Sequence, residues 1–216
     1  MKVNYFLSPA RVLLFFTVLV LSACGGADKL PAIPTGSTVL VLGDSLSYGT
    51  GAKEGEDYPT LLAQSTGWDV INAGVPGDTS AQGLARLPEL LEEYQPKLLM
   101  IVLGGNDFLK KVPLAQTEKN LKAIIQAAKL KNIATLIIAI PDYQPVKAAF
   151  GGLSDHSLYA TLAEETQTPL IEETFTNVLS KNSLKADYVH PNAKGYKQVE
   201  AQLRASLMEL GVLNAQ

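Results

Sequence analysis

The chain has 216 residues, of which 47% are hydrophobic and 18% are charged, and its formal net charge is -3. This length suits one well-buried domain and is short for two, and the apolar content excludes a disordered or purely solvated polypeptide. A mildly acidic chain without a basic stripe has little electrostatic reason to bind nucleic acid.

The N-terminus has the pattern of a secretory signal peptide. Lys2 and Arg11 form a short basic region, and a strongly apolar run follows over residues 12–21. That run is well below the roughly 20 apolar residues that a transmembrane helix needs, so a permanent membrane span is the weaker interpretation. We therefore predict that residues 1–23 are a signal peptide.

Cys24 is the only cysteine of the chain, which excludes an intramolecular disulfide. Residues 21–24, Leu-Ser-Ala-Cys, resemble the lipobox of bacterial lipoproteins. The resemblance implies a lipid on Cys24 and a flexible tether over residues 24–36. An incidental cysteine after a cleaved signal is the alternative. Gly25 stands where an Asp keeps some lipoproteins in the inner membrane, so we expect an envelope protein that faces the periplasm, with the outer membrane favoured.

Past the tether, short apolar segments alternate with segments of helical period. In chain order, we expect a strand at 38–42, a helix at 58–65, a strand at 69–71, a helix at 81–94, a strand at 97–103, a helix at 117–131, a strand at 134–140, a helix at 154–166, a strand at 170–171 and a helix at 193–210. This alternation indicates a parallel sheet with helices on each side. We predict a single α/β domain over residues 37–216, a three-layer α/β/α sandwich with a five-stranded parallel, flavodoxin-like sheet.

Polar residues cluster just after the expected strands, where parallel sheets bind ligands. Four blocks stand out: Gly-Asp-Ser-Leu-Ser at 43–47, Asn-Ala-Gly-Val-Pro-Gly-Asp at 72–78, Gly-Gly-Asn-Asp at 104–107 and Asp-Tyr-Val-His-Pro-Asn at 187–192. Each block is a weak signal alone, but the four in this order resemble the SGNH branch of the GDSL hydrolases. Within that branch they are most similar to bacterial periplasmic thioesterases, lysophospholipases and arylesterases. The resemblance runs from Val39 to about Leu210.

The residues support a serine mechanism independently of that resemblance. A serine hydroxyl needs an adjacent base, which in turn needs a group that holds its tautomer. The chain has two histidines, and His190 follows Asp187 by three residues, so one tight loop could join them and face Ser45. His156 follows Asp155 at an expected helix start, which suggests a surface or capping role. We predict Ser45, Asp187 and His190 as the catalytic triad of an esterase, lysophospholipase or thioesterase.

The resemblance also implies an oxyanion hole and a role for Asp44. The hole would consist of the backbone N–H groups of Ser45 and Gly74 and the side-chain amide of Asn106. Gly74 could equally be a turn residue with positive φ, Asn106 a loop residue that satisfies backbone groups, and Ser45 a simple helix N-cap. Asp44 is expected to be a structural hydrogen-bond acceptor beside the nucleophile.

The substrate pocket is the least determined part of the site. Phe108, Leu109 and Phe150, the last within the loop at 141–152, could form apolar walls for an acyl chain, with ordinary loop packing as the alternative. Tyr48 could narrow the pocket. The resemblance implies a small acyl-ester substrate, no cofactor, no metal and a monomer.

Two rival classes use the same residues. A metal-dependent phosphoesterase could gather Asp44, Asp107, Asp187 and His190, although no His-x-His or His-Glu-x-x-His motif is present. A non-catalytic envelope lipoprotein that binds a small ligand could also use the fold. A carbohydrate O-acetyl esterase of the same fold is a further alternative. An α/β-hydrolase is disfavoured because no Gly-x-Ser-x-Gly sequence occurs.

Overall fold

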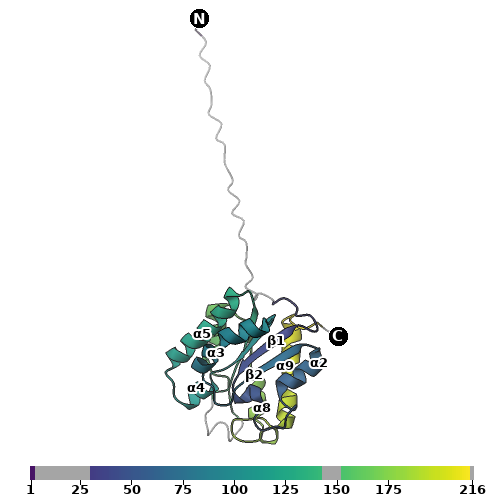
Figure 1. Ribbon diagram of the computed structural model, residues 1–216. Helices are drawn as coiled ribbons and strands as arrows, with labels where there is room; N and C mark the ends of the chain where they lie inside the picture. Colours follow the sequence, from purple (N-terminus) through teal and green to yellow (C-terminus); the bar gives the residue numbers. More distant parts are fainter. Residues whose placement is uncertain (3–29, 143–151, 215–216) are drawn as a thin grey trace.

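A computed structural model of the chain describes residues 1–2, 30–142 and 152–214. Within them, a five-stranded parallel sheet has the order β2-β1-β3-β4-β5, so the predicted flavodoxin-like sheet is confirmed (Figure 1). Its strands are β1 (Thr38–Gly43), β2 (Asp69–Gly74), β3 (Leu98–Val102), β4 (Ala134–Ile138) and β5 (Leu170–Ile171).

The two faces of the sheet carry separate groups of helices, which gives the predicted three layers (Figure 1). One group packs together from α2 (Tyr58–Thr66), α8 (Thr174–Leu179) and α9 (Ala193–Glu209). The other group consists of α3 (Ser80–Tyr94), α5 (Leu114–Leu130) and α7 (Leu158–Thr166). The chain first moves from β1 to β2 at one edge of the sheet and later from β3 toward β5 at the other edge. Right-handed crossovers toward opposite edges of a sheet place their helices on opposite faces, which explains this division.

The central strands form the core. Each residue of β3 is buried, as are the residues of β1 after Thr38, in agreement with strands that are covered on both faces. Strand β2 is an edge strand whose residues are exposed or half-buried. It continues to Gly74, three residues beyond the predicted end at Ile71, because the pairing with β1 continues to Gly43 opposite Gly74.

Short helices interrupt the loops after the strands. The sequence did not predict α1 (Ser45–Tyr48), α4 (Gly105–Leu109), α8 or the 3-10 helix η1 (Asn182–Leu184), which are too short to show a helical period. Within the described ranges, no helix has the length and apolar character needed to cross a membrane.

Helix α7 begins at Leu158, four residues later than the predicted start at Ser154. Asp155 is not part of the helix. It forms an antiparallel bridge with Pro141, and its carboxylate accepts hydrogen bonds from the Glu173 N–H and the Thr176 hydroxyl. These contacts join the start of α7 to α8, which an earlier helix start would break.

The strand order decides where the site forms. Strand β1 lies between β2 and β3, so the loops that follow these three strands meet at one edge of the sheet (Figure 1). Capping residues then start the next long helices close to that edge. Thr79 and Gln82 form a capping box at α3, and the Asn192 side chain accepts the Gly195 N–H at α9.

Candidate active site

The first loop holds Ser45 against the end of β1. Helix α1 folds back so closely that a Cβ on Gly43 would lie 2.1 Å from the Ser47 hydroxyl oxygen, so only glycine fits there. Asp44 caps α1 by accepting the Leu46 N–H at 2.9 Å. Ser45 is thus the first residue of the helix and not its N-cap.

The structure brings Ser45, His190 and Asp187 together. The Ser45 Oγ lies 2.9 Å from His190 Nε2, and His190 Nδ1 lies 2.7 Å from Asp187 Oδ2. The other carboxylate oxygen of Asp187 accepts the backbone N–H groups of Val189 at 2.8 Å and His190 at 2.9 Å. The loop therefore wraps around the carboxylate and orients the imidazole toward Ser45, which is the geometry of a serine nucleophile and its base.

The Asp187 carboxylate is held in its charged form. Partial burial opposes ionisation, but the hydrogen bonds with the His190 ring and with the Val189 and His190 N–H groups outweigh it and lower the pKa of Asp187. A charged carboxylate beside Nδ1 keeps the proton on that nitrogen, and Nε2 is left to accept from Ser45.

The structure does not support the expected oxyanion role of Gly74. Its N–H donates to the Asn72 side-chain oxygen at 3.0 Å, and its φ is not positive. Gly74 is the point where α1 packs on β2, because a Cβ there would lie 2.3 Å from the Tyr48 nitrogen. Gly74 is absent from the cavity lining, so its role is close packing.

Gly77 occupies the position expected of Gly74. It follows Pro76 in a turn with φ 85°, closed by the Asp78 N–H donating to the Val75 carbonyl at 3.1 Å, and it lines the cavity beside Ser45. Neither the Gly77 nor the Ser45 N–H donates to an acceptor within the described residues. The Val-Pro-Gly-Asp sequence is typical of a turn with glycine at its third position, a signal that could have identified Gly77.

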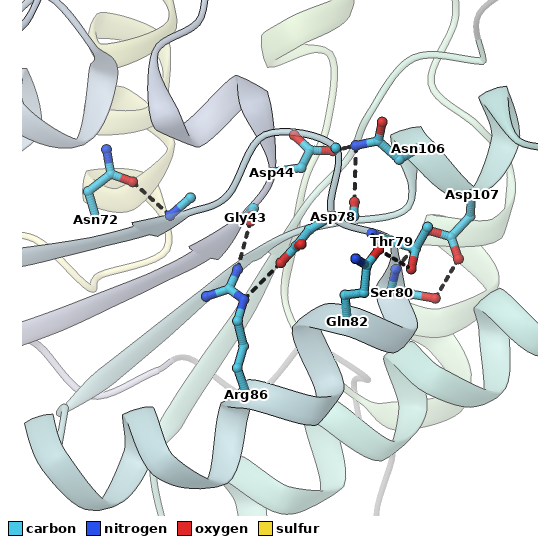
Figure 2. Close-up of polar contacts among 12 residues, drawn as sticks. Gly43, Asp44, Asn72, Asp78, Thr79, Ser80, Gln82, Arg86, Asn106 and Asp107 are labelled. Atoms are coloured by element: carbon cyan, nitrogen blue, oxygen red, sulfur yellow. Dashed lines mark hydrogen bonds and ion pairs between the residues drawn. The ribbon is translucent and has the colours of Figure 1, made fainter.

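Asn106 lines the same cavity, but its amide is already bonded. The Nδ2 group donates to the Asp44 carboxylate and to the Asp78 carbonyl, each at 3.0 Å (Figure 2). Both amide hydrogens thus point toward neighbouring loops, and the nitrogen is held between the loop that follows β1 and the loop that follows β2.

Asp44 is a buried acceptor, as the resemblance implied. Its carboxylate receives the Leu46 N–H and the Asn106 amide. Burial raises the pKa of Asp44 to about 6, against the lowering effects of the Leu46 and Asn106 hydrogen bonds and of the nearby His190 charge.

The cavity beside Ser45 has a volume of about 280 Å³ and a mainly apolar lining. Besides Asp44, Ser45, Gly77, Asn106 and His190, it is lined by Leu46, Thr50, Pro76, Gly105, Phe108, Leu109, Ile140, Pro141, Leu153, Leu179 and Val189.

Only some of the predicted pocket residues line the cavity. Phe108 and Leu109 lie in the lining. Tyr48 is not in the lining: it ends the single turn of α1 over the end of β2, and 59% of it is exposed. Phe150 lies outside the described residues. His156 accepts the Leu158 N–H at 3.1 Å, the expected capping role, and its ring also stacks on Phe108 with centroids 4.0 Å apart.

Asp107, one of the acidic residues considered as a metal ligand, is bonded to neighbouring helices. The Asp107 carboxylate is buried between helices, where it accepts the Ser80 N–H at 2.7 Å and the Ser80 hydroxyl at 2.5 Å (Figure 2). It also accepts the Thr117 hydroxyl at 3.2 Å. Within the part of the chain that the structure describes, no cluster of three or more potential metal ligands was found.

Known proteins are similar to this chain in sequence and in fold. The profile of the GDSL-like Lipase/Acylhydrolase family matches residues 41–198. The chain is 37% identical over 163 residues to Thioesterase 1/protease 1/lysophospholipase L1 of Escherichia coli K12, covering 72% of this chain and 76% of that protein. It is 36% identical over 183 residues to Esterase TesA of Pseudomonas aeruginosa, covering 80% and 89%. The crystal structure of the psychrotrophic esterase EstA from Pseudoalteromonas, inhibited by monoethylphosphonate, matches with a TM-score of 0.69 at 30% identity, covering 80% of this chain and 97% of that one.

The buried Asp44 predicts a pH-dependent stability difference. Its folded pKa of about 6 is above the ordinary value of 3.8, so the folded state binds more protons than the unfolded state between these pH values. The free energy of unfolding of wild type should therefore fall by roughly 2–3 kcal/mol relative to that of Asp44→Asn as pH rises from about 4 to 7, and the difference should stay level above that. Urea unfolding of both proteins at several pH values measures it. A difference that does not change with pH would contradict the perturbed titration.

Proposed function

Because this chain belongs to the GDSL-like lipase/acylhydrolase family and is an ester hydrolase of the SGNH type, we propose that Ser45, His190 and Asp187 are its catalytic triad. One observation carries the assignment: the hydrogen-bonded series from Ser45 Oγ through His190 to Asp187 opens onto an apolar cavity. In this proposal, His190 takes the Ser45 proton as the oxygen attacks the ester carbonyl. It returns that proton to the leaving alcohol or thiol, and water then cleaves the acyl-enzyme with the same base.

The proposed oxyanion hole consists of the Ser45 and Gly77 N–H groups and the Asn106 amide. The two N–H groups without an acceptor in the described residues support it, as does the place of all three residues in the cavity lining. Asn106 would share an amide hydrogen that is now donated to Asp44 or to the Asp78 carbonyl. Each such donor contributes on the order of 10²–10³ in rate, because it is oriented before the charge develops.

The triad predicts how activity responds to mutation and to chelation. Ser45→Ala should lower the turnover of p-nitrophenyl esters by several orders of magnitude, since the acyl-enzyme cannot form, while EDTA should change neither protein. The assay uses the soluble form that lacks residues 1–24. Loss of wild-type activity in EDTA would instead support the metal-dependent mechanism. If wild type and Ser45→Ala are both folded and equally inactive, the result would support the binding-protein alternative.

We propose that the cavity holds the acyl chain of a carboxylic ester or thioester. Its apolar lining supports this choice, because burying methylene groups there is favourable by about 0.8 kcal/mol each. Leu109 is half exposed at the edge of this lining, where it can cover the outer part of a chain.

Acyl-chain burial predicts a length-dependent effect of Leu109→Ala. The variant should lower kcat/KM for octanoate roughly 3- to 10-fold and leave acetate nearly unchanged, because only the longer chain reaches that contact. Leu130→Ala, which truncates an exposed leucine outside the cavity, is the matched control. Equal losses for acetate and octanoate would rule out this acyl wall.

We further propose that residues 1–23 are a cleaved signal peptide and that a lipid on Cys24 holds the enzyme in the bacterial envelope, facing the periplasm. The outer membrane is favoured because Gly25 replaces the Asp of the inner-membrane signal. The sequence pattern supports both proposals, and residues 3–29 lie outside the described residues.

A fatty-acid label tests the anchor. Cells fed an alkyne fatty acid should label wild type and Ser45→Ala, but not Cys24→Ser, because only Cys24 would carry the lipid. Ser45→Ala is a necessary control, since the enzyme could itself trap the fatty acid as an acyl-enzyme. Label that survives in Cys24→Ser but disappears in Ser45→Ala would refute lipidation.

A further inference from the structure

Arg86 joins two of the loops that form the site. From helix α3, its Nε donates to the Asp78 carboxylate at 2.9 Å and its Nη2 donates to the Gly43 carbonyl at 2.9 Å (Figure 2). The side chain is 23% exposed and that of Asp78 is 8% exposed, so this ion pair is largely shielded from water. Charge-assisted hydrogen bonds of this kind are stronger than neutral ones.

Both acceptors belong to the catalytic blocks. Gly43 is the last residue of β1 and immediately precedes Asp44 and Ser45, and its carbonyl also accepts the Val75 N–H at 3.2 Å. Arg86 therefore fastens the turn after β2 to the strand that carries the nucleophile.

Asp78 is held at three points. Its N–H closes the turn on the Val75 carbonyl, its carboxylate binds Arg86, and its own carbonyl accepts the Asn106 amide at 3.0 Å. A continuous series thus runs from Arg86 through Asp78 to Asn106 and ends on the Asp44 carboxylate (Figure 2). Without Arg86, the Asp78 carboxylate would lose its ion-pair partner, and the turn that bears Gly77 would be held only by its backbone contacts at Asp78.

We propose that Arg86 is a positioning residue for ester hydrolysis, which holds the Gly77–Asp78 turn and, through the Asp78 carbonyl, the Asn106 amide in the geometry that accepts the oxyanion. This inference rests on the proposed oxyanion hole. Arg86 is absent from the cavity lining, so its effect passes through other residues.

Arginine suits this role because its planar guanidinium presents several N–H groups in fixed directions. One nitrogen points to a carboxylate and another to a carbonyl on a different loop. A lysine ammonium is a compact charge on a flexible stem and cannot span both acceptors with the same fixed geometry.

The main experiment compares kcat and KM for p-nitrophenyl butyrate in wild type, Arg86→Met and Arg86→Lys. Small displacements of positioned groups can cost about 10²-fold in rate, so we expect Arg86→Met to lower kcat about 10- to 100-fold with KM within about 3-fold of wild type. Arg86→Lys should recover only part of the loss, and it also serves if Arg86→Met does not fold. The proposal is overturned if a folded Arg86 variant keeps wild-type kcat or loses activity through KM alone.

The matched control is Arg204→Met. Arg204 forms an ion pair with Glu200 within α9 at 3.2 Å and is 40% exposed, so its loss removes an arginine and an ion pair away from the cavity. It should keep wild-type kcat. A fall in Arg204→Met as large as that in Arg86→Met would attribute the effect to general destabilisation and overturn the proposal.

A double-mutant cycle separates this inference from the proposed oxyanion hole. If Arg86 acts through Asn106, the loss in Asn106→Ala and the loss in Arg86→Met should not multiply in the double variant. Fully multiplicative losses would overturn the positioning role while leaving the hole intact. If Asn106→Ala alone keeps wild-type kcat, the hole as proposed fails, and the role of Arg86 fails with it.

Discussion

The whole site depends on the parallel pairing of β1 with β2 on one side and β3 on the other. This register sets Gly43 opposite both Gly74 and Val102, so the chain leaves three adjacent strands at the same level. The loops that follow are therefore forced together at one edge. Close approach is possible because Gly43 and Gly74 have no side chains where α1 folds over the strand ends.

Buried charge is the main cost of this arrangement. Asp44, Asp78 and Asp107 are all buried in the segments that follow β1, β2 and β3, and each carboxylate has identified hydrogen-bond donors. The donors differ: a backbone N–H and an amide serve Asp44, and an arginine serves Asp78. Burial raises the pKa of Asp44, because its two neutral donors do not fully replace the water that a charged carboxylate loses.

These polar contacts also link the loops around Ser45 to the rest of the fold. Ser80 and Thr117 fix Asp107, the neighbour of Asn106 in α4, so the long helices α3 and α5 help to place the amide. On the opposite side, Asn192 caps α9 directly after the loop of His190. The loops that carry Gly77, Asp187 and His190 are thus held between regular elements whose own packing is extensive.

The sequence by itself predicted the α/β class and the five parallel strands from alternating periods along the chain. It predicted Ser45, Asp187 and His190 as the triad from the motif blocks, their family resemblance and the local spacing of Asp187 and His190. Only the tertiary structure decided that the Gly77 N–H, unlike that of Gly74, has no acceptor among the described residues, that Tyr48 lies outside the cavity, and that Arg86 joins two loops. A local turn pattern can mark a glycine such as Gly77, but the role of its N–H or of a long side chain depends on which acceptor lies within about 3 Å. Such distances between separate loops are set by strand register and helix packing, which a local pattern does not encode.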